Sequence, residues 1–557
     1  MQTLTQLPSW LTSTPELLAG IQRGIEKESL RVDAAGVLAQ SEHPRGLGSA
    51  LTHESVTTDF SESLLEFITP PSAHVSDTLV ALSEIHTFAY KHLGDEQLWS
   101  ASMPCIVSGD ASIPVARYGS SNVGRMKTVY RLGLGNRYGR MMQAIAGVHY
   151  NFSIPDSFWE AERSASNAPE ASLQDYKTRR YLDLIRNFRT WSWLLIYLYG
   201  ASPAVCESFL AGRSDHGLET LDTDCGTLYL PYATALRMGN LGYNSSSQSS
   251  LRICYNSLDN YLRTLTEAIL EPHDVYAAFQ GEENGELMQL SDGLLQIENE
   301  FYSTIRPKRS AKSGEAALTA LHQRGIEYVE VRCNDVNPFV PVGIDRPQVR
   351  FIDSFLVHCL LQPSPECNEA VQERQISNQS LVVSRGREPG LVLETDNGPL
   401  TLRAWAQELL AGISQSAILL DEIHGSSEHQ DAVALQQRKL SGEEELPSAR
   451  VLREMRDRNM SYSRLARAYS QHWAEHFRAS EITADRLEQL TAESTSSLAR
   501  QSSLDRIINK LRTIPSRLLR PISSSRSELR PVAFSWNSWR LEPTATDGCS
   551  LTPRTTA

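Results

Sequence analysis

The sequence has little of what marks a secreted, membrane or nucleic-acid-binding protein. Its eight cysteines are scattered without a Cys-x-x-Cys pair, which disfavours a disulfide framework or a thiolate zinc site and indicates reduced thiols. The N-terminus lacks the positive start, apolar centre and small-residue cleavage site of an export signal. A formal net charge of -13 disfavours binding to nucleic acid through overall positive potential. We therefore expect a cytoplasmic protein with no nucleic-acid partner.

Long apolar runs are also missing. The most apolar stretch, 191–199, has about half the length that a helix needs to cross a bilayer, so we expect a buried helix end and no membrane association. The sequence contains no internal repeat and no G-x-x-x-x-G-K-[ST] phosphate-binding loop. Its hydrophobic fraction of 41% and charged fraction of 21% are ordinary for a globular protein. Length alone allows about two to four domains.

The pattern along the chain divides it into three parts. Residues 1–370 interleave strand-like and helix-like segments and are predicted to form the core domain. In this part we expect strands at 24–32, 64–69 and 148–153 and helices at 14–23, 76–93, 173–200 and 257–270. Residues 371–500 are predicted to be mainly helical, for example at 400–421 and 449–477, and to pack on that core. Residues 501–557 are basic and rich in serine, which predicts a disordered tail.

Acidic residues inside strand-like segments are the strongest functional signal. Glu26 and Glu28 lie two residues apart, so a strand places both carboxylates on one face. Two like charges that close repel each other unless a cation lies between them or one is neutralised, which suggests a metal site. A solvated strand face is the alternative for an isolated pair. Further acidic residues in short apolar runs, at Glu66, Glu327 and Glu330, favour the metal site.

Several side chains have the chemistry of a magnesium site. The acidic set consists of Glu26, Glu28, Asp59, Glu66 and Glu330. Magnesium prefers carboxylate oxygens and is commonly shared with substrate phosphates, so ATP is the expected ligand. His149 alternates with Asn151 and Ser153 on the polar face of a strand. Either this histidine is structural, or its imidazole joins the site and manganese is tolerated as well.

A second set of side chains is cationic or aromatic. It consists of Tyr130, Arg131, Arg237, Tyr243, Tyr302, Arg306, Lys308, Arg309 and Arg332. Arginine can hold a carboxylate or phosphate through two hydrogen bonds, so substrates with such groups are implied. Most arginines are surface charges or partners in structural ion pairs. Arg332 is the strongest candidate for the site, because it shares a strand face with Glu330.

Eight ordered motifs carry a specific resemblance to a known family. They are GIQRGIEKESLRV, GSALTHESVTTDFSESLLEFITP, SMPC, YGSSNVGRMKTVYRLGLGNRYG, GVHYNFSIP, LPYATALRMGNLGY, QIENEFYSTIRPKR and GIEYVEVRCNDVNPF. Together they resemble glutamate-cysteine ligases of the proteobacterial type, densely from about residue 8 to 365 and thinly beyond. The resemblance implies an α+β fold, in which a curved, mostly antiparallel sheet forms a glutamine-synthetase-like catalytic funnel with helices packed outside.

The resemblance also implies roles for individual residues. The implied metal ligands are Glu26, Glu28, Asp59, Glu66, His149 and Glu330. Within this set, Glu26 is expected near His149 and Glu330, and Glu28 near Glu66. The implied amino-acid-binding positions are Phe60, Tyr130, Arg131, Gln143, Arg237, Tyr243 and Tyr302. Arg306 and Arg332 are expected to contact ATP, and Arg332 to act catalytically by stabilising the transferring phosphoryl group.

The implied reaction joins the γ-carboxylate of L-glutamate to the amine of L-cysteine, with Mg²⁺ bound and ATP consumed, through γ-glutamyl phosphate. Its product, γ-glutamylcysteine, begins glutathione biosynthesis, and we expect the enzyme to be a monomer. A ligase for another amine would differ around Tyr130 and Tyr243, and a regulator without turnover would have lost metal-binding carboxylates. Neither change is present. A bifunctional enzyme that completes glutathione would need a longer chain.

Overall fold

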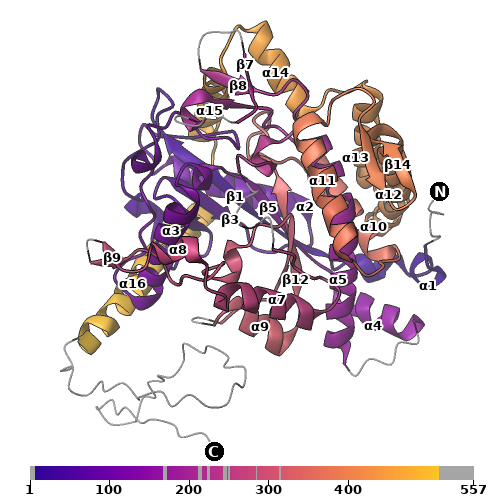
Figure 1. Cartoon of the computed structure of the whole chain (residues 1–557), viewed down its shortest axis with the longest axis horizontal. Helices are drawn as coiled ribbons and strands as arrows, with labels where there is room; N and C mark the ends of the chain where they lie inside the picture. The colour runs from indigo at the N-terminus through magenta and orange to yellow at the C-terminus, as the bar shows by residue number, and fades with distance from the viewer. Residues whose placement is uncertain are drawn as a thin grey trace, which may run out of the picture.

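The computed structural model describes residues 7–166, 172–210, 216–221, 226–242, 248, 251–283, 285–312 and 315–512. At its centre is a seven-stranded sheet with the order β11-β12-β5-β1-β3-β2, in which β4 pairs with β1 (Figure 1). Its strands are β1 (Gln22–Val32), β2 (Val56–Thr58), β3 (Leu64–Ile68), β4 (Gln97–Leu98), β5 (Val148–Ser153), β11 (Ile305–Lys308) and β12 (Tyr328–Asn334). Every pairing between these strands is antiparallel, so the predicted mostly antiparallel α+β fold is confirmed.

Within the described residues, three small sheets lie outside the central one. They are formed by β6 (Ala204–Cys206), β7 (Glu219–Thr220) and β8 (Thr227–Tyr229), by β9 (Glu282–Glu283) and β10 (Glu286–Leu287), and by β13 (Val392–Thr395) and β14 (Gly398–Thr401). The first half of the chain contributes the helices α1 (Ser9–Thr12), α2 (Val75–Tyr90), α3 (Asn122–Tyr138), α4 (Asp156–Ala165), α5 (Leu173–Trp191), α6 (Trp193–Tyr199), α7 (Leu258–Leu270) and α8 (Asp274–Ala277). The second half contributes α9 (Ala317–Arg324), α10 (Arg346–Leu361), α11 (Glu369–Arg385), α12 (Leu402–His424), α13 (Glu428–Ser441), α14 (Pro447–Asp457), α15 (Tyr462–Ala479) and α16 (Ala484–Arg512).

The two faces of the central sheet have different surroundings. Odd-numbered side chains of β1 point towards α2 and α10: the Lys27 ammonium lies 3.1 Å from the His86 imidazole, and Arg23 pairs with Asp353. Even-numbered side chains of β1 point to the opposite face, where the acidic residues gather. Buried apolar side chains from both halves of the chain form one continuous hydrophobic cluster. No helix in the described part of the chain is both long and apolar enough to span a membrane.

Most predicted elements are confirmed, with two kinds of difference. Predicted helices at 173–200 and 449–477 are each two helices; the second break includes Asn459, whose φ of 49° lies in the left-handed region. The predicted helix at 14–23 is wrong. Its Thr-Pro start gives only a single 3₁₀ turn at Pro15–Leu18, because pairing with β5 already begins at Gln22. The apolar run near 191–199 is helical and buried, as predicted.

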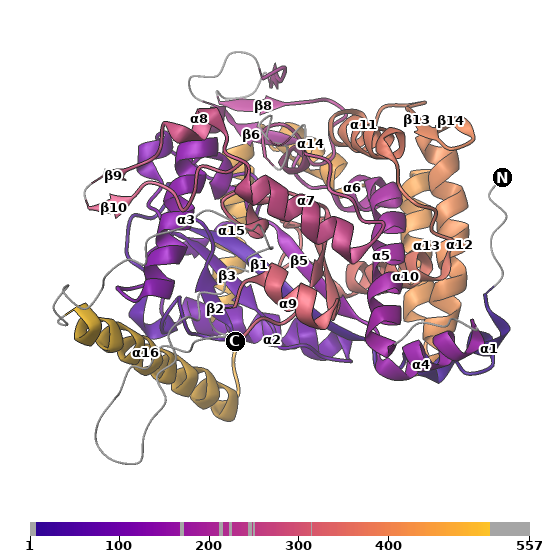
Figure 2. The same cartoon turned by 60° about the horizontal axis from the view of Figure 1, so that its bottom comes forward.

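The predicted start of the tail at 501 falls inside α16, which lies along one edge of the molecule (Figures 1 and 2). This helix is bonded to the core through polar groups. The Asp505 carboxylate accepts hydrogen bonds from the backbone N–H groups of Ser120 and Ser121, at 3.0 and 2.7 Å, at the start of α3. Ser497 binds the backbone of Ser49. Residues 513–557 of the predicted tail lie outside the described residues.

Truncation after Arg500 is therefore expected to destabilise the protein, whereas truncation after Arg512 is not. The shorter chain loses Asp505 and leaves two N–H groups at the start of α3 without their charged acceptor. Hydrogen bonds to charged groups contribute about 1.5–3 kcal/mol each, so the free energy of unfolding should fall by roughly that amount or more. Urea denaturation of both truncated proteins measures the difference, and equal midpoints would show that the contacts of Asp505 are unimportant.

Candidate active site

The register of the sheet brings acidic residues from distant segments to one face. In β1, Glu28 lies directly opposite Glu66 of β3, and Glu26 lies opposite His149 of β5. On the next strand, Glu330 of β12 lies opposite Asn151 of β5. Directly opposed residues of antiparallel strands project from the same face with their Cβ atoms about 4.5–5.5 Å apart. The face therefore carries a continuous row of polar groups across four strands.

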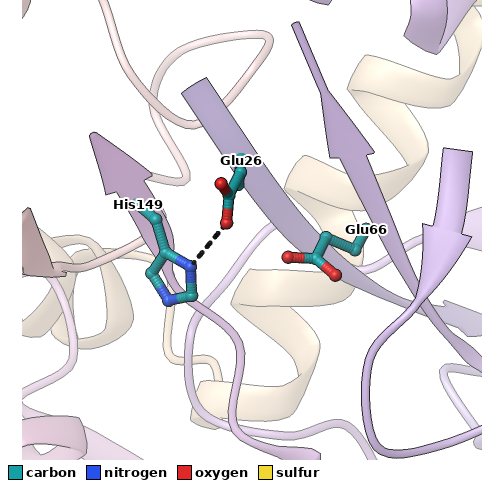
Figure 3. A group of neighbouring side chains, drawn as sticks. All are labelled: Glu26, Glu66 and His149. Carbon is teal, nitrogen blue, oxygen red and sulfur yellow. Dashed lines mark hydrogen bonds and ion pairs between the residues drawn. The ribbon is translucent and has the colours of Figure 1, made fainter. Parts of the chain in front are cut away.

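Three of these residues form the tightest group. Ligand atoms of Glu26, Glu66 and His149 all lie within 4.8 Å of one another (Figure 3). The Nδ1 atom of His149 is 3.4 Å from Oε2 of Glu26, and Asn151 Nδ2 donates a 2.8 Å hydrogen bond to Oε1 of the same carboxylate. His149 and Asn151 thus fix the orientation of Glu26.

Glu28 and Glu330 border this group, and each has partners of its own. The Glu28 carboxylate accepts a 2.6 Å hydrogen bond from the N–H of Gly147 and lies 3.8 Å from Nε2 of His149. Glu330 is buried between two cations, Lys308 at 3.1 Å and Arg332 at 3.0 Å. The expected proximity of Glu26 to His149 and of Glu28 to Glu66 is present, but Glu66 also joins Glu26 and His149.

The protonation of the carboxylates reflects their crowding. Burial raises the pKa of Glu66 well above its usual value, and the charges of Glu26, Asp59 and Glu28 raise it further. Burial and Glu330 also raise the pKa of Glu26, but the hydrogen bond with His149 and the charge of Lys308 outweigh them, so this pKa is lowered. A cation would relieve the remaining repulsion between these groups.

Two buried polar atoms that make no hydrogen bond also fit a bound cation. Among the residues described, the buried Nε2 of His149 and the buried Oδ1 of Asn151 have no hydrogen-bond partner. Buried polar atoms of this kind normally have one, and exceptions call for an explanation such as an ion or water. Their position beside Glu26 makes a divalent cation the explanation that fits the donor set.

Asp59 and Arg131 lie at the margin of the face. The Asp59 side chain is 44% exposed, and its carboxylate is 4.0 Å from the guanidinium of Arg131. Arg131 also donates to the Asp59 carbonyl and stacks over the ring of Tyr118 at 4.6 Å. Arg131 therefore ties α3 to the loop that carries Asp59.

The predicted substrate-binding residues divide into two groups. Gln143 donates a 2.7 Å hydrogen bond to the hydroxyl of Tyr302, and Tyr130 lies close enough to Tyr302 for the two hydroxyls to interact electrostatically. Phe60 and Arg237 are instead fully buried, and Arg237 donates to the carbonyl of Arg332 at 3.0 Å. Arg237 thus supports the backbone of β12.

Arg306 and Tyr243 complete the predicted set. The Nη2 atom of Arg306 donates to the carbonyl of Asn299 at 2.8 Å and also to the carbonyl of Phe301. This part of the guanidinium therefore holds the turn before β11. Tyr243 lies outside the described residues.

Lys308 and Asn151 also lie at the site; the sequence places Lys308 among the cationic candidates and Asn151 on the polar face with His149, but it assigns a role to neither. The alternation of strand side chains could have indicated both, because Lys308 follows Arg306 by two positions and Asn151 follows His149 by two.

Comparison with known proteins identifies the family. The family model for glutamate-cysteine ligase matches residues 9–382, which is more than half of the chain. The chain belongs to the glutamate-cysteine ligase family. It is 49% identical to the glutamate-cysteine ligase of Saccharophagus degradans over 494 residues, which cover 88% of this chain and 92% of the relative. It is 48% identical to that of Alcanivorax borkumensis over 493 residues, covering 87% and 93%.

Solved structures agree with this identification. The glutamate-cysteine ligase of Francisella tularensis, determined in complex with AMP, matches with a TM-score of 0.80 and 36% identity over 88% of this chain and 97% of that one. A bifunctional glutathione synthetase from Pasteurella multocida matches with a TM-score of 0.65 and 23% identity, covering 84% of this chain and 54% of the other, which supports the fold alone. This ligase thus catalyses the ATP-dependent joining of glutamate to cysteine that begins glutathione synthesis.

Proposed function

We propose that the acidic face holds magnesium-bound ATP while the γ-carboxylate of glutamate is phosphorylated, and that the amine of cysteine then displaces the phosphate. The convergence of ligand atoms from Glu26, Glu66 and His149 within 4.8 Å is the observation that carries this proposal. In this proposal, Glu28, Asp59 and Glu330 are further ligands at the edges of the group. Bound magnesium would neutralise the triphosphate and screen the approach of an anionic nucleophile. Manganese, which accepts imidazole more readily, is proposed to substitute for it.

Two cations of the chain are placed to stabilise the phosphoryl group. Arg332 and Lys308 both contact Glu330, so they lie beside the metal ligands on neighbouring strands. Phosphoryl transfer spreads negative charge over the equatorial oxygens, and fixed cations aimed at them lower the barrier. Arg332 can present two N–H groups to such oxygens and is the proposed catalytic residue. Arg306 supports ATP binding from β11 in this proposal.

The neutral, aromatic part of the site suits cysteine. Tyr130, Tyr302 and Gln143 present rings and uncharged polar groups, and a thiol is a weak hydrogen-bonding group that packs well against aromatic rings. Glutamate carries two carboxylates and requires cationic partners, for which Arg131 and Arg237 are the candidates. Phe60 and Tyr243 are proposed to complete the amino-acid pocket.

Release of ADP from the purified enzyme tests the function. With ATP, glutamate and magnesium, release is expected to depend on L-cysteine or 2-aminobutyrate, and to stop when EDTA removes the metal. An unrelated amine such as glycine serves as the control for the acceptor. Release that is independent of the acceptor, or unaffected by EDTA, would overturn the proposal. We also infer a cytoplasmic location, which the scattered cysteines favour, and a monomeric state, which sedimentation would test.

Replacing Asn151 by Ala is expected to weaken magnesium binding by about 10–100-fold, because partners that orient a ligating carboxylate typically contribute that factor. The readout is the magnesium concentration that gives half-maximal activity. Asn378→Ala is the matched control, because the side chain of Asn378 on α11 also donates a 2.8 Å hydrogen bond, but to the carbonyl of Glu394 on β13, away from the acidic face. An unchanged magnesium requirement in Asn151→Ala would remove this residue from the site.

A further inference from the structure

A buried carboxylate, Glu300, is linked through hydrogen bonds to two of the aromatic residues proposed for the amino-acid pocket. It ends a single 3₁₀ turn at Glu298–Glu300, just before β11, and its side chain and that of Arg137 on α3 are both fully buried. Oε1 of Glu300 accepts hydrogen bonds from Arg137 at 3.0 Å and from the hydroxyl of Tyr138 at 2.7 Å. Oε2 accepts one from the N–H of Gln296 at 2.7 Å. The carboxylate thus joins α3 to the segment 296–300.

One branch of this arrangement reaches Tyr130. Gln296, whose N–H binds Glu300, donates from its side chain to the backbone carbonyl of Tyr130 at 3.2 Å. Burial raises the pKa of Tyr130 well above its usual value, and the charge of Glu300 raises it further, so the phenol remains neutral. The position of Tyr130 therefore depends on where Glu300 holds Gln296.

The other branch reaches Tyr302. The side chain of Gln248 donates to the Glu300 carbonyl at 2.9 Å and to the Tyr138 hydroxyl at 3.1 Å, and it accepts from the N–H of Tyr302 at 3.2 Å. The rings of Tyr138 and Tyr302 meet edge to face, with centroids 6.2 Å apart. The backbone of Tyr302 is thereby linked to Glu300, through the Glu300 carbonyl and through the Tyr138 hydroxyl that donates to the carboxylate, while the Tyr302 hydroxyl accepts from Gln143.

Burying an ion pair in this way is a poor means of gaining stability, because desolvation offsets most of the attraction. Its geometry, however, is specific: one carboxylate receives three donors from α3 and from the segment that precedes β11. We propose that Glu300, held by Arg137, is a positioning residue that sets the separation of Tyr130 and Tyr302 and thereby the affinity for cysteine. This inference rests on the proposed assignment of these two tyrosines to the cysteine pocket.

Steady-state kinetics of Glu300→Gln test the inference. The amide keeps the shape of the side chain, but its NH2 group can only donate. It would face the groups that donate to the Glu300 carboxylate, so the 3₁₀ turn at Glu298–Glu300 must shift. We expect the KM for L-cysteine and for 2-aminobutyrate to rise about tenfold, with kcat and the KM for ATP and glutamate within twofold of the unsubstituted enzyme. Glu300→Asp, which keeps the charge, should recover part of the affinity.

Glu162→Gln provides the matched control. Glu162 is a buried partner of Arg180, 3.0 Å away between α4 and α5, so it undergoes the same chemical change without any link to the tyrosines. This variant should leave all three KM values unchanged. In a folded Glu300→Gln protein, an unchanged KM for cysteine, or equal rises for all three substrates, would overturn the inference. If Glu300→Gln does not fold, Arg137→Lys is judged by the same KM criterion.

Tyr302→Phe separates this inference from the proposed function. If Tyr302 lines the cysteine pocket, the loss of its hydroxyl raises the KM for cysteine. The double variant Tyr302→Phe, Glu300→Gln should raise this KM by less than the product of the two single effects, because both substitutions act through Tyr302. A KM unaffected by Tyr302→Phe would overturn the pocket assignment itself. A raised KM in Tyr302→Phe together with a normal one in Glu300→Gln would overturn only the role of Glu300.

Discussion

Glu26→Gln is expected to lower kcat by a factor of about 10²–10⁴. Glu26 is at the centre of the acidic face, where His149 and Asn151 orient it and Glu66 approaches it. The amide removes one negative charge from the proposed metal group. Metal ions contribute several kcal/mol to the stabilisation of charge in a transition state, and about 1.4 kcal/mol corresponds to a factor of ten in rate. Raising the magnesium concentration should restore part of the activity. The measurement is kcat at saturating substrates over a range of magnesium concentrations.

The same substitution should not unfold the protein. Glu26→Gln removes the like-charge repulsion that raises the pKa of Glu66, but it also removes the attraction to His149 and Lys308 that lowers the pKa of Glu26. These two effects oppose each other, so the melting temperature in EDTA is expected to change little. Glu327→Gln is the control: its side chain is 42% exposed, just before β12, and its ion pair with Arg309 at 3.7 Å is at the surface. Its activity should be normal. A kcat for Glu26→Gln within tenfold of the unsubstituted enzyme would exclude Glu26 from the metal group.

Part of this site could be predicted from the sequence because strand geometry is local. The two-residue spacing of Glu26 and Glu28 fixes their common face, and the alternation through 148–153 does the same for His149. Which residues face one another across strands is not local. The pairing of Glu28 with Glu66, and of Glu330 with Asn151, depends on register between distant segments, and the resemblance to a family supplied what spacing could not.

The errors have equally specific causes. The Thr-Pro signal at 14–15 is a valid helix start, but strand pairing from Gln22 leaves room for only one 3₁₀ turn before β1. For α16, the sequence shows serine and basic residues that resemble a solvated tail. Its docking instead uses polar side chains, including Ser497 and Asp505, on backbone groups of the core. Such contacts leave no hydrophobic periodicity for a sequence pattern to reveal.

Behind the acidic face, a buried polar cluster connects the catalytic strands to the helices. Asp353 of α10 is fully buried, accepts a 2.6 Å hydrogen bond from the Tyr150 hydroxyl, and pairs with Arg23 at 3.1 Å. Tyr150 lies between His149 and Asn151 in sequence, with its side chain on the opposite face of β5. Burial lowers the pKa of Arg23, but Asp353 and Tyr150 outweigh this effect, so Arg23 stays charged. Asp353 therefore anchors both β1 and β5 from behind the site.

Asp353→Ala is accordingly expected to lower the free energy of unfolding by about 3–5 kcal/mol, because it leaves the Arg23 guanidinium buried without its counter-ion. Equilibrium urea denaturation measures the loss. Asp156→Ala is the control: the ion pair of Asp156 with Lys177 is shorter, at 2.5 Å, but the Asp156 side chain is 66% exposed, and such pairs contribute about 0–1 kcal/mol.

We expect the loss of stability in Asp353→Ala to come from the buried Arg23 charge that is left unpaired, rather than from the loss of a favourable ion pair. A second variant separates these two causes. Arg23→Met, Tyr150→Phe and Asp353→Leu together replace the cluster by apolar groups of similar size, which leaves neither Arg23 nor Asp353 as an unpaired buried charge and should recover most of the stability. Magnesium affinity is then the decisive readout. If the cluster serves mainly to hold β1 and β5 in register, the stable apolar variant should still bind magnesium more weakly than the unsubstituted enzyme. Unaltered affinity would mean that packing alone positions Glu26 and His149.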